Sequence, residues 1–227
     1  RHFFSNIAKL LPEFKGVNFL IRRGEKPENY YIGVNRNFSE KMARKVLKNK
    51  YLLKAIDVTK ETYAEYSNFT NIEKMQAIDI NYWLMKDILL KADRMTMASG
   101  LEGRVPFIDK CVFDVAKTLP IEYKVTKENT KVALREAARE VIPTEAYKKK
   151  KLGFPVPIRE WIKDDDVYEE VKNTLNSEIA KYYFNTKLLN KLLIEHKNNK
   201  KDNYRKIWTV YCFLKWYDVF FKEVANV

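Results

Sequence analysis

The sequence of 227 residues contains few cysteines, glycines and prolines, and it has no long apolar run. Two cysteines, Cys111 and Cys212, are too few for a disulfide framework or a metal cluster, which favours a reducing compartment. Six glycines and seven prolines are fewer than the tight turns of an all-β sandwich require. The most apolar stretch, 207–214, is much shorter than the roughly 20 residues that span a bilayer, and no signal peptide is visible. These absences predict a cytoplasmic protein that does not cross a membrane.

Motifs for nucleotide, nucleophile or metal chemistry are also missing. The sequence has no glycine-rich phosphate loop, no dinucleotide fingerprint and no Gly-x-Ser-x-Gly motif. His2 and His196 have no Cys or Asp partners at ligand spacing, so we expect no metal site in this chain.

What the chain does have is positive charge and apolar bulk. The formal net charge is +13, and 46% of the residues are hydrophobic, which is typical of a globular protein with an anionic partner. One hypothesis is therefore a basic helical module that binds nucleic acid. Acidic residues at 164–166 interrupt the charge, and no recognition-helix motif stands out, which makes this alternative weaker. The residues that would follow a phosphate backbone are Lys197, Lys200, Lys201, Arg205 and Lys206.

The apolar spacing predicts an all-α fold. A short helix is expected over residues 1–11, a second from an N-cap at Ser39 through Lys50, and a third over 60–66. Thr70 and Glu73 have the capping-box spacing, so a long helix should begin there and end near Ser99, with Gly100 as its stop signal.

Later capping signals predict a series of further helices. Asp109 should cap a helix that ends at Pro120, and Asn129 or Thr130 should cap another that ends at Pro143. The first of these is expected to bury Val112, Phe113 and Ala116. The remaining expectations are a short helix begun by Pro157 and containing Trp161, a leucine-faced helix capped by Thr186, and a last helix from about Asp202 that is apolar nearly all round and deeply packed.

Residues 89–109 hold the densest group of candidate site residues. Glu102 and Arg104 stand two positions apart between two glycines and a proline, where burying a carboxylate and a guanidinium would be costly. A surface ion pair beside a helix end explains them more simply. The glycines favour a functional role, because they let the backbone approach a ligand closely. A carboxylate held in such a turn can serve as a general base or orient an ammonium group. Asp93 and Arg94 fit a structural role, pairing with neighbours on the helix.

Four consecutive lysines, Lys148 to Lys151, precede a rigid Gly-Phe-Pro turn. A solvated charge run is the usual explanation of such a cluster. Lysine also fits phosphate or pyrophosphate as a compact point charge, and Lys131, at a helix start, is placed to join it.

Several of these segments resemble one family. The run ADRMTMASGLEGRVPFID at 92–109 closely resembles the signature in the synthetase domain of glutamine-hydrolysing asparagine synthetases. The run KVALR at 131–135 and the run KLGFPVP at 151–157 are similar to the next block of the family in order and spacing. The tail, with His196 and Trp216, resembles the closing helix, and the strong similarity covers about 80–162.

The resemblance implies a fold and a domain order. Residues 1–227 would be a single helical segment, the C-terminal portion of an adenine-nucleotide α-hydrolase-like synthetase domain. The parallel sheet, the Ser-Gly-Gly-x-Asp-Ser pyrophosphate loop and the N-terminal glutaminase domain would lie upstream of Arg1. We therefore expect a fragment that does not make β-aspartyl-AMP by itself and binds no cofactor tightly.

The resemblance also implies substrates and residue roles. The intact enzyme would use ATP and Mg²⁺ to convert aspartate to β-aspartyl-AMP, and ammonia from the glutaminase domain would displace AMP. Glu102 would be the catalytic glutamate, Lys151 would contact pyrophosphate and Lys131 would be a second phosphate-facing lysine. Arg104 would hold the Glu102 turn in place, which is a supporting role; Asp93 and Arg94 are taken as supporting residues of the long helix. No metal ligand would come from this fragment.

One position departs from the family, and two further questions stay open. Lys149 stands where the family often has arginine, which removes a planar bidentate donor. A related synthetase that forms another amide or a β-lactam from the same adenylate chemistry is a second alternative, although the Gly-Leu-Glu-Gly-Arg context at 100–104 favours asparagine. A homodimer is a further expectation, because unpaired apolar helix faces favour self-association.

Overall fold

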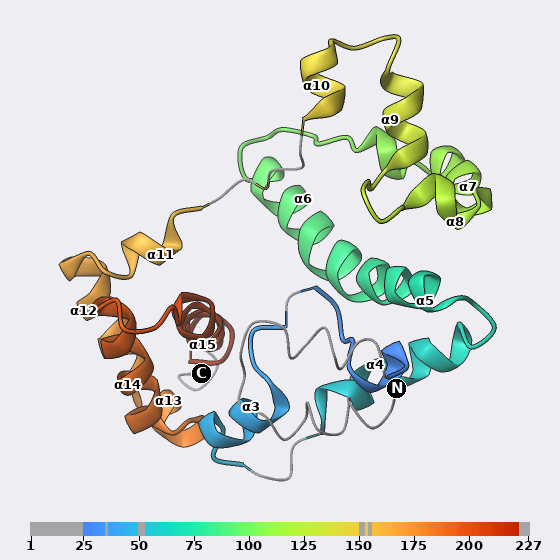
Figure 1. The fold of residues 1–227 in the computed structure, drawn as a ribbon. Helices are drawn as coiled ribbons and strands as arrows, with labels where there is room; N and C mark the ends of the chain where they lie inside the picture. The colour runs from blue at the N-terminus through green and yellow to red at the C-terminus, as the bar shows by residue number, and fades with distance from the viewer. Residues whose placement is uncertain (1–24, 35, 50–52, 150–152, 154–155, 223–227) are drawn as a thin grey trace. The chain divides into compact units, whose positions relative to one another are not determined.

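The computed structural model describes residues 25–34, 36–49, 53–149, 153 and 156–222. This part of the chain is helical and contains no strand, in agreement with the all-α prediction. Two isolated antiparallel bridges, Leu47 with Phe184 and Val125 with Thr130, are its extended pairings. The chain divides into two compact units, the first formed by 1–91 and 157–227 and the second by 92–156 (Figure 1). The expected helix over residues 1–11 and the lysine at 151 lie outside the described residues.

The first unit contains most of the longer helices. Its elements are η1 (Pro27–Asn29), α3 (Glu40–Val46), α4 (Ala55–Glu65), α5 (Asn71–Ile78), η2 (Asp79–Leu89), α11 (Ile158–Trp161), α12 (Asp165–Leu175), α13 (Glu178–Tyr183), α14 (Thr186–Lys197), α15 (Tyr204–Tyr217) and η4 (Asp218–Lys222).

A hydrophobic cluster holds α12, α14 and α15 together, and each of these helices contacts the other two (Figure 1). Each helix gives the cluster one apolar face at helical spacing: Val171 and Leu175, then Leu189, Leu192 and Leu193, then Ile207, Val210 and Leu214. Val46 of α3 and Phe184 also belong to the cluster, beside the bridge from Leu47 to Phe184. Burying these aliphatic side chains contributes roughly 1.5–3 kcal/mol each, which makes the cluster the main stabilising feature of this unit.

A smaller cluster of Tyr31, Tyr63 and Ile78 stabilises the segment before α3. The Tyr63 hydroxyl donates to the Tyr31 carbonyl at 2.8 Å, and the Tyr31 hydroxyl donates to Asp79 Oδ2 at 2.6 Å. Burial raises the pKa of Tyr63 well above its usual value, so its hydroxyl stays a donor. Asp79 Oδ1 also accepts the Val34 amide at 3.2 Å, which fixes the turn where Gly33 has a φ of +109°.

One continuous helical run crosses from the first unit to the second. It comprises α5, the π-helical stretch η2 and α6 (Leu90–Met97). The capping box at its start is confirmed, because Thr70 Oγ1 accepts the Glu73 amide and Glu73 Oε2 accepts the Thr70 amide. The π-helical stretch was not predicted, since apolar spacing does not distinguish it from an α-helix.

The second unit has short helices and no buried residue among those described. It receives most of α6, and its other elements are η3 (Pro106–Ile108), α7 (Lys110–Thr118), α8 (Ile121–Lys124), α9 (Val132–Ala138) and α10 (Thr144–Lys148). Asp109 caps α7 as predicted, accepting the Cys111 amide at 2.8 Å. The predicted burial of Val112, Phe113 and Ala116 is wrong, because no opposing surface within the described residues covers α7.

Other predictions of helix boundaries and packing also need correction. The cap of α14 is Asn185, which accepts the Leu188 amide, and not Thr186. The helix capped by Ser39 ends at Val46 and not at Lys50, because Leu47 becomes extended to form its bridge. The cap of α9 is Lys131, since residues 125 and 130 pair with each other instead of starting the helix. The last helix buries one face only, and Trp216 and Phe220 are about half exposed.

No helix in the described part of the chain has the length and apolarity needed to cross a membrane.

Candidate functional site

The loop after α6 positions the predicted catalytic carboxylate. Gly100 adopts a φ of +67° and its amide donates to the Met97 carbonyl, while the Leu101 amide donates to the Thr96 carbonyl at 3.0 Å. These bonds close the helix at the predicted glycine, a conformation that side chains other than glycine adopt at a cost. The chain therefore leaves the helix in a defined direction just before Glu102.

Glu102 and Arg104 form an ion pair at the surface of this loop. Arg104 Nη2 lies 2.6 Å from Glu102 Oε1, and the two side chains are 71% and 83% exposed for glutamate and arginine respectively. The sequence argument that this pair is costly to bury does not apply, since neither side chain is buried. An exposed pair contributes little to stability, so the arrangement leaves a carboxylate open to a ligand and held by its neighbouring guanidinium.

Asp93 and Arg94 lie one turn before the end of α6, and both are exposed. The expectation that their side chains pair with helix neighbours is not met among the described residues, where neither has a hydrogen bond or ion pair. Their backbone carbonyls do serve the helix end: Asp93 accepts from Thr96 Oγ1 and Arg94 from the Ala98 amide. The two charged side chains therefore face solvent.

Lys131 is exposed and occupies a strained backbone position. Its φ of 59° and ψ of 41° lie in the left-handed region, which costs a residue with a side chain of order 1–3 kcal/mol. Its amide donates to the Lys124 carbonyl at 2.9 Å, and its carbonyl accepts from the Arg135 amide, so neighbouring bonds on both sides hold this conformation. Such strain concentrates at functional positions.

Arg135 is a positioning residue that the sequence reasoning quoted without a role. Its guanidinium donates to three backbone carbonyls: Thr130 at 3.2 Å, Tyr147, and Lys149 at 3.1 Å. These bonds join the start of α9 to the end of α10, directly before the lysines at 150 and 151. The planar guanidinium has five N–H donors and can therefore bridge several carbonyls. The sequence pattern KVALR does not indicate which distant carbonyls Arg135 will contact.

The structure thus brings Glu102 to Arg104, and it brings Arg135 to the segment that precedes Lys151. It records no contact of Lys131 with Glu102 among the described residues. The same part of the chain contains no group of three or more His, Cys, Asp or Glu side chains placed to hold a metal ion.

A model of the asparagine synthase family matches residues 10–218 of this chain. The chain belongs to the asparagine synthase family. Asparagine synthetase [glutamine-hydrolyzing] 1 of Bacillus subtilis is 43% identical over 216 residues, which are 94% of this chain and 34% of that protein. A putative asparagine synthetase [glutamine-hydrolyzing] of Mycobacterium tuberculosis is 38% identical over 222 residues, or 97% of this chain and 34% of that relative.

This member of the asparagine synthase family spans about a third of the length of these curated relatives. A putative asparagine synthetase [glutamine-hydrolyzing] 1 of Methanocaldococcus jannaschii matches more narrowly, at 48% identity over 46 residues, which are 20% of this chain and 8% of that protein. No solved structure matches the chain.

Proposed function

We propose that this chain forms the C-terminal part of an ATP-dependent asparagine synthetase that works in the cytoplasm. In this reaction aspartate attacks ATP to give β-aspartyl-AMP and pyrophosphate, and ammonia then displaces AMP to give asparagine. The observation that carries the proposal is the exposed, ion-paired Glu102 on a fixed loop inside the family match.

Glu102 is proposed as the group that handles the proton of the attacking ammonia. When nitrogen attacks the acyl carbon of the adenylate it becomes positively charged, and a nearby carboxylate stabilises that charge and accepts the proton. Arg104 orients the carboxylate through the 2.6 Å contact. Its role is positioning, since proton transfer occurs at Glu102.

Lys131 and Lys151 are proposed to bind the phosphates. Breaking the bond to pyrophosphate places negative charge on the leaving group, and fixed cations there stabilise the transition state. The strained backbone of Lys131 supports this role, and Arg135 supports that of Lys151 by anchoring the carbonyl of Lys149. This bond involves the backbone carbonyl of residue 149, so it forms with lysine at that position as well as with arginine.

Magnesium is proposed to come with the phosphates of ATP as part of the substrate. Within the described residues no group of three or more His, Cys, Asp or Glu side chains is placed to hold a metal ion, and no step is assigned to the metal. Asp93 and Arg94 are proposed as supporting residues, and the ammonia is proposed to come from a glutaminase domain.

The exposed apolar side chains of the 92–156 unit support an assembly with more polypeptide. Phe107, Val115 and Val141 are each at least 65% exposed, and exposing large apolar side chains to water is unfavourable. We propose that these side chains are covered by polypeptide corresponding to the other two thirds or so of the relatives. A homodimer is the competing occupant, and sedimentation of the chain with and without that polypeptide distinguishes the two.

A chimeric enzyme tests the proposed function. This chain replaces the matching third of the Bacillus subtilis relative, and asparagine formation is measured with aspartate, ATP and ammonium. Activity that requires all three substrates is the expected result. The 227-residue chain tested separately should show no aspartate-dependent exchange of pyrophosphate into ATP, and robust exchange would contradict the need for the rest of the enzyme.

Glu102→Gln in the chimera tests the catalytic role. Asparagine formation should fall by about 10²–10⁴-fold, the usual contribution of a general base. Far-UV circular dichroism should be unchanged, because the side chain is largely exposed. The matched control is Glu128→Gln, which removes an exposed glutamate of the same unit that has no assigned role. Equal activity of the two variants would remove Glu102 from the chemistry.

A further inference from the structure

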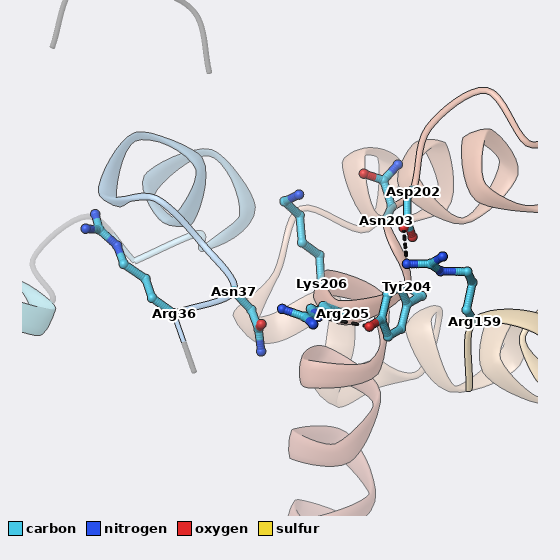
Figure 2. A pocket seen from close by; sticks show the side chains of 8 residues that line it. All are labelled: Arg36, Asn37, Arg159, Asp202, Asn203, Tyr204, Arg205 and Lys206. Carbon is cyan, nitrogen blue, oxygen red and sulfur yellow. Dashed lines mark hydrogen bonds and ion pairs between the residues drawn. The ribbon is translucent and has the colours of Figure 1, made fainter. Parts of the chain in front are cut away.

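A polar pocket of about 280 Å³ lies at the start of α15, built entirely from the first unit (Figure 2). It is bordered by four cationic side chains, one carboxylate and three neutral polar side chains. These residues are Arg36, Arg159, Arg205 and Lys206, then Asp202, then Asn37, Asn203 and Tyr204. None of them has a role in the proposed reaction.

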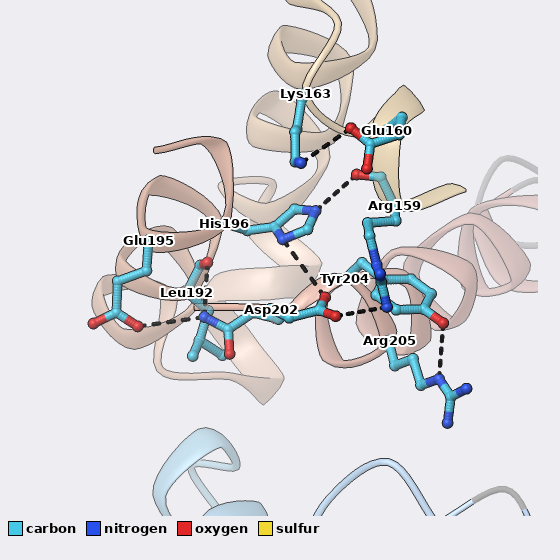
Figure 3. A network of polar contacts seen from close by, with 10 residues as sticks. Arg159, Glu160, Lys163, Leu192, Glu195, His196, Asp202, Tyr204 and Arg205 are labelled. Carbon is cyan, nitrogen blue, oxygen red and sulfur yellow. Dashed lines mark hydrogen bonds and ion pairs between the residues drawn. The ribbon is translucent and has the colours of Figure 1, made fainter. Parts of the chain in front are cut away.

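Tyr204 orients two of the arginines. The Arg205 Nε donates to the Tyr204 hydroxyl at 2.9 Å, and its guanidinium carbon lies 5.6 Å from the centre of the ring. The Arg159 guanidinium carbon lies 5.0 Å from the same ring, and Arg159 Nη2 lies 2.7 Å from Asp202 Oδ2 (Figure 3). Contacts of this kind restrict both guanidinium groups before any ligand arrives.

Buried polar contacts to α14 fix the backbone of the pocket. His196 is 2% exposed, and its Nε2 lies 2.9 Å from the Arg159 carbonyl (Figure 3). The buried Asn203 donates to the Leu192 carbonyl at 3.2 Å and to Glu195 Oε2 at 3.3 Å. Because the Asn203 side chain is used in this way, it does not cap the first amides of α15.

The positive charge of the pocket is only partly neutralised. Asp202 pairs with Arg159, whereas within the described residues Lys206 has no ion pair and Arg205 contacts only the neutral Tyr204. Arg36 donates to the carbonyls of Tyr30 and Phe38, which orient its guanidinium without cancelling its charge. An anion in the pocket would compensate this positive charge.

We propose that this pocket binds a small phosphate-bearing anion. Phosphate oxygens match the planar donors of Arg205 and the compact charge of Lys206. A nucleic-acid backbone fits less well, because the basic residues do not form a continuous stripe. Lys197 lies 2.5 Å from Asp165 and donates to the Lys163 carbonyl, so its charge is already used.

Isothermal titration calorimetry tests the proposal. The 227-residue chain is titrated with inorganic pyrophosphate and with inorganic phosphate at about 150 mM salt, where long-range electrostatic attraction is screened. The test variant is Arg205→Gln with Lys206→Gln. The matched control is Lys200→Gln with Lys201→Gln, which removes the same charge from exposed neighbours that do not border the pocket. Pyrophosphate binding should weaken at least about tenfold in the test variant and less than about twofold in the control.

Three results would overturn the proposal: no saturable binding by the unmodified chain, equal weakening in both double variants, or a preference for duplex DNA that both variants lose equally. AMP as a further probe distinguishes free pyrophosphate from a nucleotide-borne phosphate, and either one fits the proposal. The single variant Arg205→Gln, exposed on α15, provides the same comparison should the double variant fail to fold.

Discussion

The α12–α15 cluster and the 92–156 unit belong to one chain but depend on different kinds of interaction. In the cluster, three helices close a core in which Leu193 and Leu214 are essentially inaccessible. In the 92–156 unit, helices are defined by caps and turns, and no described residue is buried. The same amphipathic patterning is present in both.

This difference teaches that an apolar helix face predicts a partner surface without saying where that surface is. For α14 the partner faces are on α12 and α15 of the same unit. For α7, whose Val112, Phe113 and Val115 are 43–65% exposed, the described chain supplies none. The candidate site residues all belong to the unit in which no described residue is buried.

The largest effect should come from the core. Leu193→Ala should lower the free energy of unfolding by about 2–5 kcal/mol, because it leaves a cavity among fully buried neighbours. Leu134→Ala in α9, where the side chain is 44% exposed, should cost less than about 1 kcal/mol. Urea denaturation followed by circular dichroism measures both. Equal losses would show that the 92–156 unit has a core in solution.

A smaller difference in the free energy of unfolding should distinguish a partly buried ion pair from an exposed one. Lys74 and Glu28 pair at 2.7 Å with side chains 11% and 27% exposed, whereas Arg104 and Glu102 pair in solvent. Lys74→Met should cost about 1–3 kcal/mol, since it leaves a partly buried carboxylate unpaired. Arg104→Met should cost less than about 1 kcal/mol by the same denaturation assay. The reverse order would contradict the comparison.

The Glu28 pair should also respond to pH. Burial pushes the pKa of Glu28 upward, but the hydrogen bond from Lys74, its own backbone amide and the charges of Lys74 and Lys26 together hold it below its usual value. A lowered pKa in the folded state means that the stabilisation is present above the unfolded value, about 4.3, and is lost as pH falls through the folded value. The stability gap between the unmodified chain and Lys74→Met should therefore narrow below about pH 4.

The smallest effect on stability should come from Lys131→Gly. Glycine adopts the left-handed backbone without strain but is more flexible when unfolded, so the net change should lie between zero and about 1 kcal/mol of stabilisation. In the chimeric enzyme the same variant should slow β-aspartyl-AMP formation, because it removes the cation proposed to bind phosphate. If Lys131→Gly lowered the free energy of unfolding and left the adenylation rate unchanged, the left-handed backbone at this position would have a structural role only.

Local hydrogen bonding explains why part of the fold was predictable. Thr70 with Glu73, Asp109 and Gly100 mark helix ends through bonds to residues within a few positions, so the residue types alone were sufficient. The candidate glutamate was likewise found from its motif. The left-handed Lys131 was not, because its conformation follows from the pairing of residues 125 and 130.

The sequence by itself determined the helical class, several helix starts and the family, because capping groups, apolar spacing and motif order are all encoded within short stretches. Only the tertiary structure decided which apolar faces are covered, how Arg135 reaches Lys149, and how Arg159 meets Asp202 beside Tyr204. The physical reason is that burial and long-range polar contacts depend on segments distant in the chain, and no short pattern specifies the surface or carbonyl that a side chain will meet.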